Sequence, residues 1–349
     1  MNGMRQDVVA ELSAVGTDFL ERAWWAADDP AEHDRLFGEA EIFGQIEVRQ
    51  PSNAVSKHDG PVRIGTWNAE RCKYVGASAR LIRESGCDVV LLSEMDVGMA
   101  RSANLHTLRA LAEELGFGYA YCAEFLELGM GNQSEQVEFA DERNLVGIHG
   151  NGILSRFPLS EPLVVNSPAR GLWYSLDWHH RRIGGRRALF ATVAVGTERI
   201  RMGSVHLESL SDPDSRSAEL SALVDSADST LPTVIGGDFN TADVPDEEAP
   251  DDWFAKPGQH EPLFDVFAAA GFDWLDCNSA VPTRRTLGNG LPRAPHRRMD
   301  WLFRRGLAAR NPLCRPAVNS AGHPISDHEL VSADFLPGLP DDHGRARGW

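Results

Sequence analysis

Five short polar fragments, each at the end of an apolar, strand-like run, constrain this chain more than any other feature. They are Thr66-Trp67-Asn68, Ser93-Glu94, Gly237-Asp238-Phe239-Asn240, Arg298-Met299-Asp300-Trp301 and Ser326-Asp327-His328. Carboxylate, amide and imidazole groups are costly to bury alone. Their repeated position at strand ends indicates one shared site, most simply a hydrated divalent cation with catalytic groups around it.

Strand and helix patterns alternate in the first half of the chain, whereas adjacent strands dominate the middle. The predicted helices cover residues 5–28, 77–85, 105–115 and 217–226. The predicted strands cover residues 62–67, 87–92, 152–155, 188–195, 200–207, 231–235, 299–303 and 330–335. This mixture predicts an α/β sandwich with mixed sheets rather than a purely parallel, doubly wound sheet.

The length of 349 residues suits one large sandwich with a small extension. We expect an N-terminal helical extension and linker over residues 1–58, the main domain over 59–336, and a flexible Gly-, Pro- and charge-rich tail over 337–349. The Trp24-Trp25 pair is either a partner or lipid contact or, as we prefer, part of a helix packed on the main domain. The acidic stretch 242–252 is expected to be solvated surface.

Cysteine usage and the N-terminus both favour a cytoplasmic protein. The five cysteines form no C-x-x-C motif, so we expect free thiols in a reducing compartment. Residues 1–20 have no continuous apolar stretch and therefore predict neither a signal peptide nor a membrane span. The oligomeric state stays open.

The net charge of −17 disfavours tight binding of duplex nucleic acid, which a basic stripe usually supports. The arginines are unevenly distributed, however. Four lie between Arg181 and Arg187 without an acid, and seven lie between Val281 and Arg305 with Asp300 as the one acid. A local positive rim on an acidic body suits a compact anionic substrate.

The fragments suggest separate chemical roles. Glu94 after its strand is a natural ligand of a hard cation, and Asn68 can coordinate the same cation or hold a phosphoryl oxygen. Asp238 and Asn240 project together after two glycines, so that one orients or deprotonates water while the other holds it or the phosphate. Asp300 is a better partner for His328 than the neighbouring Asp327, which is then free to face the cation.

Each fragment has an ordinary alternative, such as a turn-forming asparagine, an Asx turn or a half-buried histidine. His206, at the end of a strand, belongs to this group, although it is also placed to donate to a phosphoryl oxygen or a leaving group. Glu70 faces the same way as Asn68 if their strand continues, and would then be a second ligand. The combination, rather than any single fragment, favours the catalytic interpretation.

In this order the fragments resemble the endonuclease/exonuclease/phosphatase superfamily of metal-dependent phosphoesterases. The residues that carry the resemblance are Trp67-Asn68, Glu94, Gly150 to Ser155, His206, Gly237 to Asn240, Met299-Asp300 and Ser326-Asp327-His328. The match spans about residues 62–336 and leaves residues 1–58 uncovered. His206 resembles the deoxyribonuclease and sphingomyelinase branches, because abasic-site endonucleases have Tyr at that position.

The resemblance implies a four-layer α/β sandwich with two mixed sheets flanked by helices, and Mg²⁺- or Mn²⁺-dependent attack of water on a phosphoester. The implied metal-site residues are Asn68, Glu94 and Asp327. The implied catalytic residues are His206, Asp238, Asn240, Asp300 and His328. The implied substrate-binding residues are Asn151 and Arg187.

We therefore expect a phosphoesterase acting on a small or lipid-like phosphoester. The alternatives are a nuclease for single-stranded or short nucleic acid, and a non-catalytic binding module with Trp24-Trp25 as its contact. Two segments, Trp178 to Arg182 and Thr283 to Arg298, are expected to select the substrate.

Overall fold

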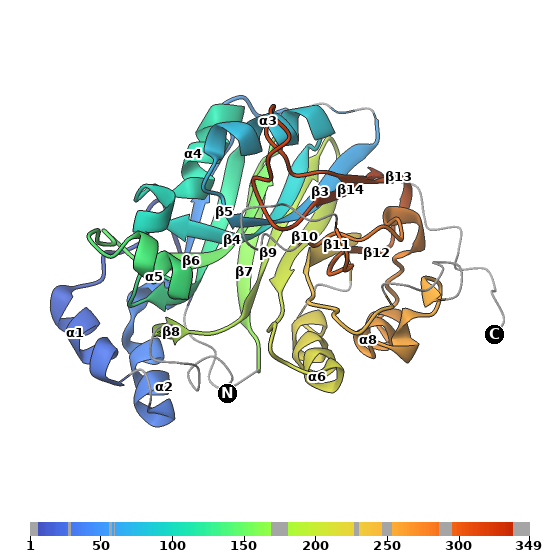
Figure 1. Ribbon diagram of the computed structural model, residues 1–349. Helices are drawn as coiled ribbons and strands as arrows, with labels where there is room; N and C mark the ends of the chain where they lie inside the picture. Colours follow the sequence, from blue (N-terminus) through green and yellow to red (C-terminus); the bar gives the residue numbers. More distant parts are fainter. Residues whose placement is uncertain are drawn as a thin grey trace.

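The computed structural model describes residues 6–26, 29–55, 58, 60–168, 181–226, 230–245, 253–285 and 295–337. Two mixed sheets pack face to face, and helices cover their outer faces (Figure 1). The predicted α/β sandwich is thus confirmed. Residues 338–349 of the predicted tail, most of the acidic stretch 242–252, and residues 178–180 and 286–294 of the two predicted substrate-selecting segments lie outside the described residues.

The first sheet has the strand order β1-β2-β5-β6-β4-β3-β14-β13, with β8 added beside β5. Its strands are β1 Asp7–Val9, β2 Gln45–Arg49, β3 Val62–Arg71, β4 Val89–Val97, β5 Gly118–Glu127, β6 Ile148–Ser155, β8 Arg182–Gly184, β13 Ala308–Arg315 and β14 Leu330–Leu336. The central pair β3 and β4 is parallel, whereas β4, β5 and β6 are joined by antiparallel pairing.

The second sheet has the order β12-β11-β10-β9-β7. Its strands are β7 Leu159–Asn166, β9 Arg187–Val195, β10 Glu198–His206, β11 Thr233–Asp238 and β12 Asp300–Arg305. Strands β10 and β11 run parallel, and β11 and β12 run antiparallel. The buried layer between the two sheets includes Ile64, Leu91, Leu189, Met202 and Val331.

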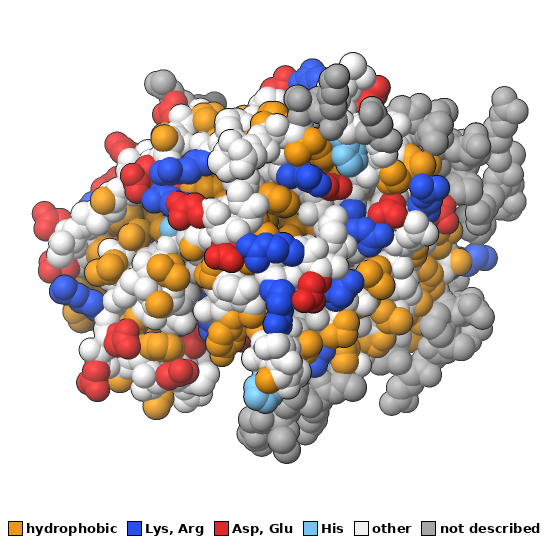
Figure 2. All heavy atoms as spheres, turned by 90° about the horizontal axis from the view of Figure 1, so that it is seen from above, with side chains coloured by type: hydrophobic (Ala, Val, Ile, Leu, Met, Phe, Trp, Pro, Cys, Tyr) orange, Lys and Arg blue, Asp and Glu red, His pale blue; other side chains and the backbone are white. Residues whose placement is uncertain are grey.

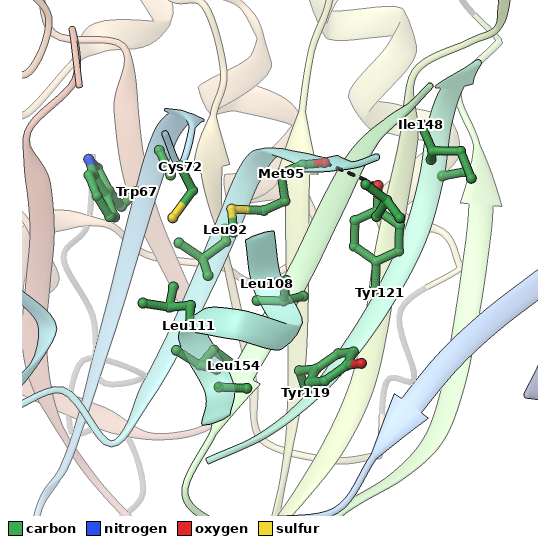
Figure 3. Packing of buried hydrophobic residues seen from close by; sticks show 14 of the residues in the cluster. Trp67, Cys72, Leu92, Met95, Leu108, Leu111, Tyr119, Tyr121, Ile148 and Leu154 are labelled. Carbon is green, nitrogen blue, oxygen red and sulfur yellow. Dashed lines mark hydrogen bonds between the residues drawn. The ribbon is translucent and has the colours of Figure 1, made fainter. Parts of the chain in front are cut away.

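The helices among the described residues are α1 Thr17–Ala26, α2 Pro30–Glu39, α3 Val75–Ser85, α4 Thr107–Leu115, α5 Gln133–Glu138, α6 Pro213–Val224 and α8 Leu263–Ala269. Helices α3 and α4 bury apolar residues in the cluster on the outer face of the first sheet. Figure 3 shows Leu108 and Leu111 of α4 beside Leu92 and Leu154 of the sheet. Helices α6 and α8 cover the second sheet through an aromatic cluster that includes Phe264 and Phe303. Together these helices and sheets make four layers.

Several helix boundaries follow from local chemistry. Gly86 and Gly116 adopt left-handed conformations directly after α3 and α4, at φ of 72° in both cases, where glycine carries no Cβ penalty. Helix α6 begins at Pro213, before the predicted residue 217, because Asp212 accepts a hydrogen bond from the Ser215 amide and caps the helix.

The prediction of one helix over residues 5–28 is wrong. Residues 7–9 form β1, which runs parallel to β2, and the helix starts only at Thr17. Tertiary hydrogen bonds replace helical ones in between, since the Leu12 amide donates to Glu47 and the Ser13 amide to Gln45. The N-terminal segment therefore adds two strands to the first sheet. The division at residue 58 stays a prediction.

All five cysteines are free thiols, as expected. Within the described ranges, no helix is both long and apolar enough to cross a membrane.

Candidate active site

The centre of the candidate site is a row of three polar residues across the second sheet. His206 of β10 pairs with Asp238 of β11, and Asp238 pairs with Asp300 of β12. Directly paired residues on neighbouring strands share a face of the sheet. The last residue of β10, the last of β11 and the first of β12 therefore gather at one sheet edge.

The first sheet supplies Asn68 and Glu94 to the same place. The Asn68 amide nitrogen donates to Glu94 Oε1 and to Asp238 Oδ2, at 3.1 Å in both cases. One side chain thus joins carboxylates from two different sheets. Asn68 Oδ1 accepts a hydrogen bond from the Glu70 amide at 3.1 Å.

His328 lies in the segment before β14 and completes the group. Its Nδ1 is 2.8 Å from Asp300 Oδ2, which is the contact expected from the sequence. Its Nε2 is 3.6 Å from Asp238 Oδ2. Ser326 fixes this segment, because its hydroxyl donates to the Asn68 carbonyl and accepts from the His328 amide.

The glycines before Asp238 have a steric reason. A Cβ on Gly237 would lie 1.7 Å from the Val205 carbonyl oxygen, so only glycine allows β11 to approach β10 this closely. Asp238 Oδ1 accepts from the Asn240 amide at 2.9 Å, and the Asn240 side chain donates to the Leu207 carbonyl. Asn240 therefore also stabilises the turn, which agrees with the alternative interpretation of this fragment as an Asx turn.

The two histidines differ in charge, because His206 is neutral and His328 is positively charged. Burial and the nearby Arg186 cation lower the pKa of His206 to about 3, so its ring is neutral at pH 7. Burial also disfavours the charged form of His328, but Asp300, Asp238 and Asp327 outweigh it and raise the pKa of His328 to about 10. An imidazole and an imidazolium therefore face the same oxygen of Asp238.

Glu94 is ionised despite its burial. Desolvation acts to raise its pKa, but the positive charge of Arg71, assisted by the Asn68 hydrogen bond, holds the pKa well below its usual range. Arg71 contacts Glu94 Oε2 directly, and its Nε lies 3.1 Å from Glu135 of α5. The site consequently offers a permanent carboxylate.

The other predicted residues lie at differing distances from this centre. Asp327 has a partly exposed side chain, 4.0 Å from His328 Nε2 and 3.6 Å from Arg284. Asn151 is fully buried and donates to the Arg187 carbonyl at 2.8 Å. The Arg187 guanidinium donates hydrogen bonds to the carbonyls of Ala123 and Phe43 and to the Asn166 side chain, so its contacts are structural. Substrate binding by Arg187 stays a prediction that these contacts do not favour.

Sequence reasoning missed three charged residues beside the site: Arg71, Arg186 and Glu124. Arg186 donates to His206 Nδ1, and Glu124 lies behind it. The run of arginines around residue 186 indicated a charged segment, but the family resemblance pointed to Arg187 rather than Arg186. Glu70, Arg71 and Cys72 have φ values of 43°, 68° and 50°, so regular strand alternation ends there. The Glu70 side chain nevertheless lies near Asp327 and Glu94, since burial and these two carboxylates raise its pKa. Its part as a second metal ligand stays a prediction.

The donor set fits a hard divalent cation. Carboxylate oxygens from Glu94 and Asp238 converge on one amide, and carboxylate oxygens of Asp238 and Asp300 lie within 4.8 Å of each other beside the His328 imidazolium. In addition, Asp300 Oδ1 is buried without a hydrogen-bond partner among the described residues. Oxygen ligands with few protein carboxylates are what Mg²⁺ takes while keeping its waters.

Comparisons with solved structures support the fold. An endonuclease/exonuclease/phosphatase from Beutenbergia cavernae superposes with a TM-score of 0.57 at 19% identity, covering 81% of this chain and 73% of that one. A family protein from Leptotrichia buccalis gives a TM-score of 0.52 at 13% identity, covering 79% and 99%. The human Nocturnin catalytic domain with bound sulfate anion gives 0.51 at 15% identity, covering 84% and 97%. These likenesses concern the fold alone.

No curated protein matches the sequence. A sequence model of the endonuclease/exonuclease/phosphatase family, in contrast, matches residues 65–328. This range includes Asn68 and His328 and all the paired strands between them. The chain therefore belongs to the endonuclease/exonuclease/phosphatase family.

Proposed function

We propose that this protein is a divalent-cation-dependent phosphoesterase that hydrolyses a phosphomonoester or phosphodiester bond of a small or lipid-like substrate. The observation that carries the proposal is the convergence of Glu94 and Asn68 from one sheet with His206, Asp238 and Asp300 from the other. Phosphoryl transfer needs positioning and charge stabilisation more than covalent chemistry from the protein.

Glu94 and Asn68, with Asp327 nearby, would hold Mg²⁺ or Mn²⁺. A cation bound there would neutralise the charge that develops on the phosphoryl oxygens. Asp238 orients or activates the attacking water, and Asn240 keeps Asp238 in position through its backbone amide. His206 offers a hydrogen to a phosphoryl or leaving oxygen.

His328 is a charged contact for the phosphate at neutral pH. Asp300 fixes the ring through Nδ1, which leaves Nε2 facing Asp238 and the space in front of it. A proton on each nitrogen makes His328 a donor in the resting protein.

The test is turnover of bis(p-nitrophenyl) phosphate and p-nitrophenyl phosphate with Mg²⁺, Mn²⁺ or EDTA. We expect cation-dependent hydrolysis, reduced on the order of 10²-fold or more by Glu94→Gln and by Asp238→Asn. Glu114→Gln, an exposed glutamate of α4 paired with Arg83, is the matched control and should keep wild-type rates. Absence of turnover with either cation, or unchanged rates in both site variants, would refute the proposal.

Two alternatives remain distinguishable from this function. A nuclease acting on single-stranded or short nucleic acid would draw on Arg284, whose side chain is exposed beside Asp327. A non-catalytic binding module would bind no Mg²⁺ in a calorimetric titration. We further propose that Trp178 to Arg182 and Thr283 to Arg298 select the substrate. Exchanging either segment should then change the ranking of substrates rather than all rates equally.

A further inference from the structure

Arg186 lies directly behind His206, on the side away from Asp238. Its Nη1 is 2.9 Å from His206 Nδ1, and both side chains are almost completely buried. His206 Nε2, at the other side of the ring, is 3.7 Å from Asp238 Oδ2. The imidazole therefore sits between a guanidinium and the centre of the candidate site.

The contact between Arg186 and His206 determines where the imidazole proton is. A guanidinium donates hydrogen bonds and accepts none, so His206 Nδ1 must be the acceptor. The proton of the neutral ring is then on Nε2, which faces Asp238. The low pKa of His206 is consistent with this arrangement, because burial and the adjacent cation both disfavour a second proton.

Three acidic or aromatic neighbours keep Arg186 in place. Its Nε lies 3.3 Å from Glu208 Oε2, its Nη1 lies 3.5 Å from Glu124 Oε2, and its guanidinium is 5.3 Å from the centre of the Phe125 ring. Glu124 Oε2 is itself only 3.8 Å from His206 Nδ1. Without Arg186, this carboxylate would be the nearest partner of Nδ1 and would favour a proton there.

We propose that Arg186 is a positioning residue that fixes His206 as a neutral, Nε2-protonated hydrogen-bond donor. Building on the proposed phosphoesterase function, His206 then stabilises a phosphoryl or leaving oxygen through Nε2–H and takes up no proton from the attacking water. The adjacent Arg187 has a different task, because its guanidinium is bound to main-chain carbonyls.

The direct test is the ¹⁵N–¹H spectrum of the histidine side chains in the full-length wild type at pH 7, with His206 assigned by its loss in His206→Gln. We expect His206 Nδ1 to resonate as an unprotonated acceptor and Nε2 as a protonated nitrogen. A doubly protonated ring, or a proton on Nδ1, would overturn the proposal. This measurement does not depend on turnover. An inactive wild type would therefore refute the proposed function, whereas the observed tautomer of His206 would still confirm or refute the role of Arg186.

Substitutions of Arg186 test its positioning role. In Arg186→Met we expect both His206 nitrogen resonances to move and kcat to fall by up to about 10²-fold with less change in KM, while Arg186→Lys retains part of both. Arg199→Met is the matched control, since Arg199 is exposed near the start of β10, pairs with Glu161, and its loss should leave the His206 resonances in place. Unchanged His206 resonances in folded Arg186→Met would contradict the proposal.

A second pair of variants separates a donor from a base. His206→Gln keeps an amide N–H near the former Nε2 position, although this amide cannot act as a base. His206→Ala has neither a hydrogen-bond donor nor a base at this position. We expect kcat of His206→Gln to stay about tenfold or more above that of His206→Ala. Equal losses in the two variants would indicate that proton transfer, rather than hydrogen bonding, is the contribution of His206.

Discussion

At the scale of single residues, the site depends on one carboxylate oxygen. Asp238 Oδ2 accepts from Asn68 at 3.1 Å and lies 3.6 Å and 3.7 Å from the Nε2 atoms of His328 and His206. The two rings are similar in type and position, but their second nitrogens have opposite partners, an aspartate for His328 and an arginine for His206. The partner of Nδ1, acting together with burial and the nearby carboxylates, therefore contributes to the different charges of the two rings.

The aspartate partner yields the first prediction. Asp300→Asn removes the negative charge that holds His328 as an imidazolium, and so both its orientation and its charge are lost. We expect kcat for bis(p-nitrophenyl) phosphate to fall about 10²- to 10⁴-fold. Asp334→Asn alters only the partly exposed contacts of Asp334 in β14 with Arg63 and Asn311, and should change kcat little. Similar rates in the two variants would show that the Asp300–His328 pair has no catalytic part.

The same pair predicts a pH dependence of stability in the metal-free protein. The pKa of His328 is raised from 6.5 to about 10, so the charged ring stabilises the folded state fully below pH 6.5. This contribution is lost as the pH rises through about 10. We therefore expect the difference in unfolding free energy between wild type and His328→Gln to shrink from pH 6 to pH 10. Urea titrations in EDTA measure it, and a constant difference would contradict the assigned charge.

At the scale of elements, strand irregularities direct the site residues. The β3–β4 register shifts between Asn68 and Arg71, and the β4–β6 register shifts between Leu92 and Met95. Glu94 lies in the second irregularity with a φ of 58°. Bulges re-aim side chains at the cost of local strain. Both first-sheet ligand candidates thus leave regular strands just where they turn toward the second sheet.

The N-terminal elements give a prediction about folding. Phe43, between α2 and β2, is fully buried, packs 4.6 Å from the Phe37 ring, and offers its carbonyl to Arg187. We expect Phe43→Ala to lower the unfolding free energy by about 3 to 5 kcal/mol. Trp25→Ala, at a side chain that is 83% exposed, should change it by less than about 0.5 kcal/mol. Equal, small effects in denaturant titrations would mean that residues 1–58 are only loosely attached.

The same elements show why the sequence allowed some predictions and not others. Strands with apolar alternation and a terminal polar residue, such as β3 and β11, were predictable from their own pattern. Strand β5 was not, because Glu124 and Glu127 interrupt its apolar residues and resemble a loop. Both glutamates are buried, and Glu124 is paired there with the Arg186 guanidinium and the Arg187 amide of another segment. Such partners are set by tertiary packing, which also explains why Arg71 and Arg186 went unnoticed.

At the scale of the whole molecule, the arginines form less of a basic rim than their density in the sequence suggests. Arg285, Arg298 and Arg304 are buried, and they bind Glu329, Asn278 and the Leu307 carbonyl, respectively. On the face in Figure 2, Lys and Arg side chains lie among Asp and Glu side chains instead of forming a continuous basic stripe. A polyanion therefore meets a mixed surface on a chain of net charge −17.

This charge distribution gives the last prediction, which separates the proposed function from the nuclease alternative. Binding of a polyanion to many basic groups weakens steeply with salt, because counterions are released, whereas one phosphate at a local site depends on salt only weakly. We expect turnover of bis(p-nitrophenyl) phosphate to change less than about threefold between 50 and 300 mM salt. Plasmid DNA and single-stranded RNA should remain largely intact under the same conditions, with Asp238→Asn as the background control. Rapid cleavage of either polymer, abolished in Asp238→Asn and strongly inhibited by salt, would favour the nuclease. An acidic molecule can show that pattern only if arginines near the site, such as the partly exposed Arg284 beside Asp327, act together along a nucleic-acid backbone.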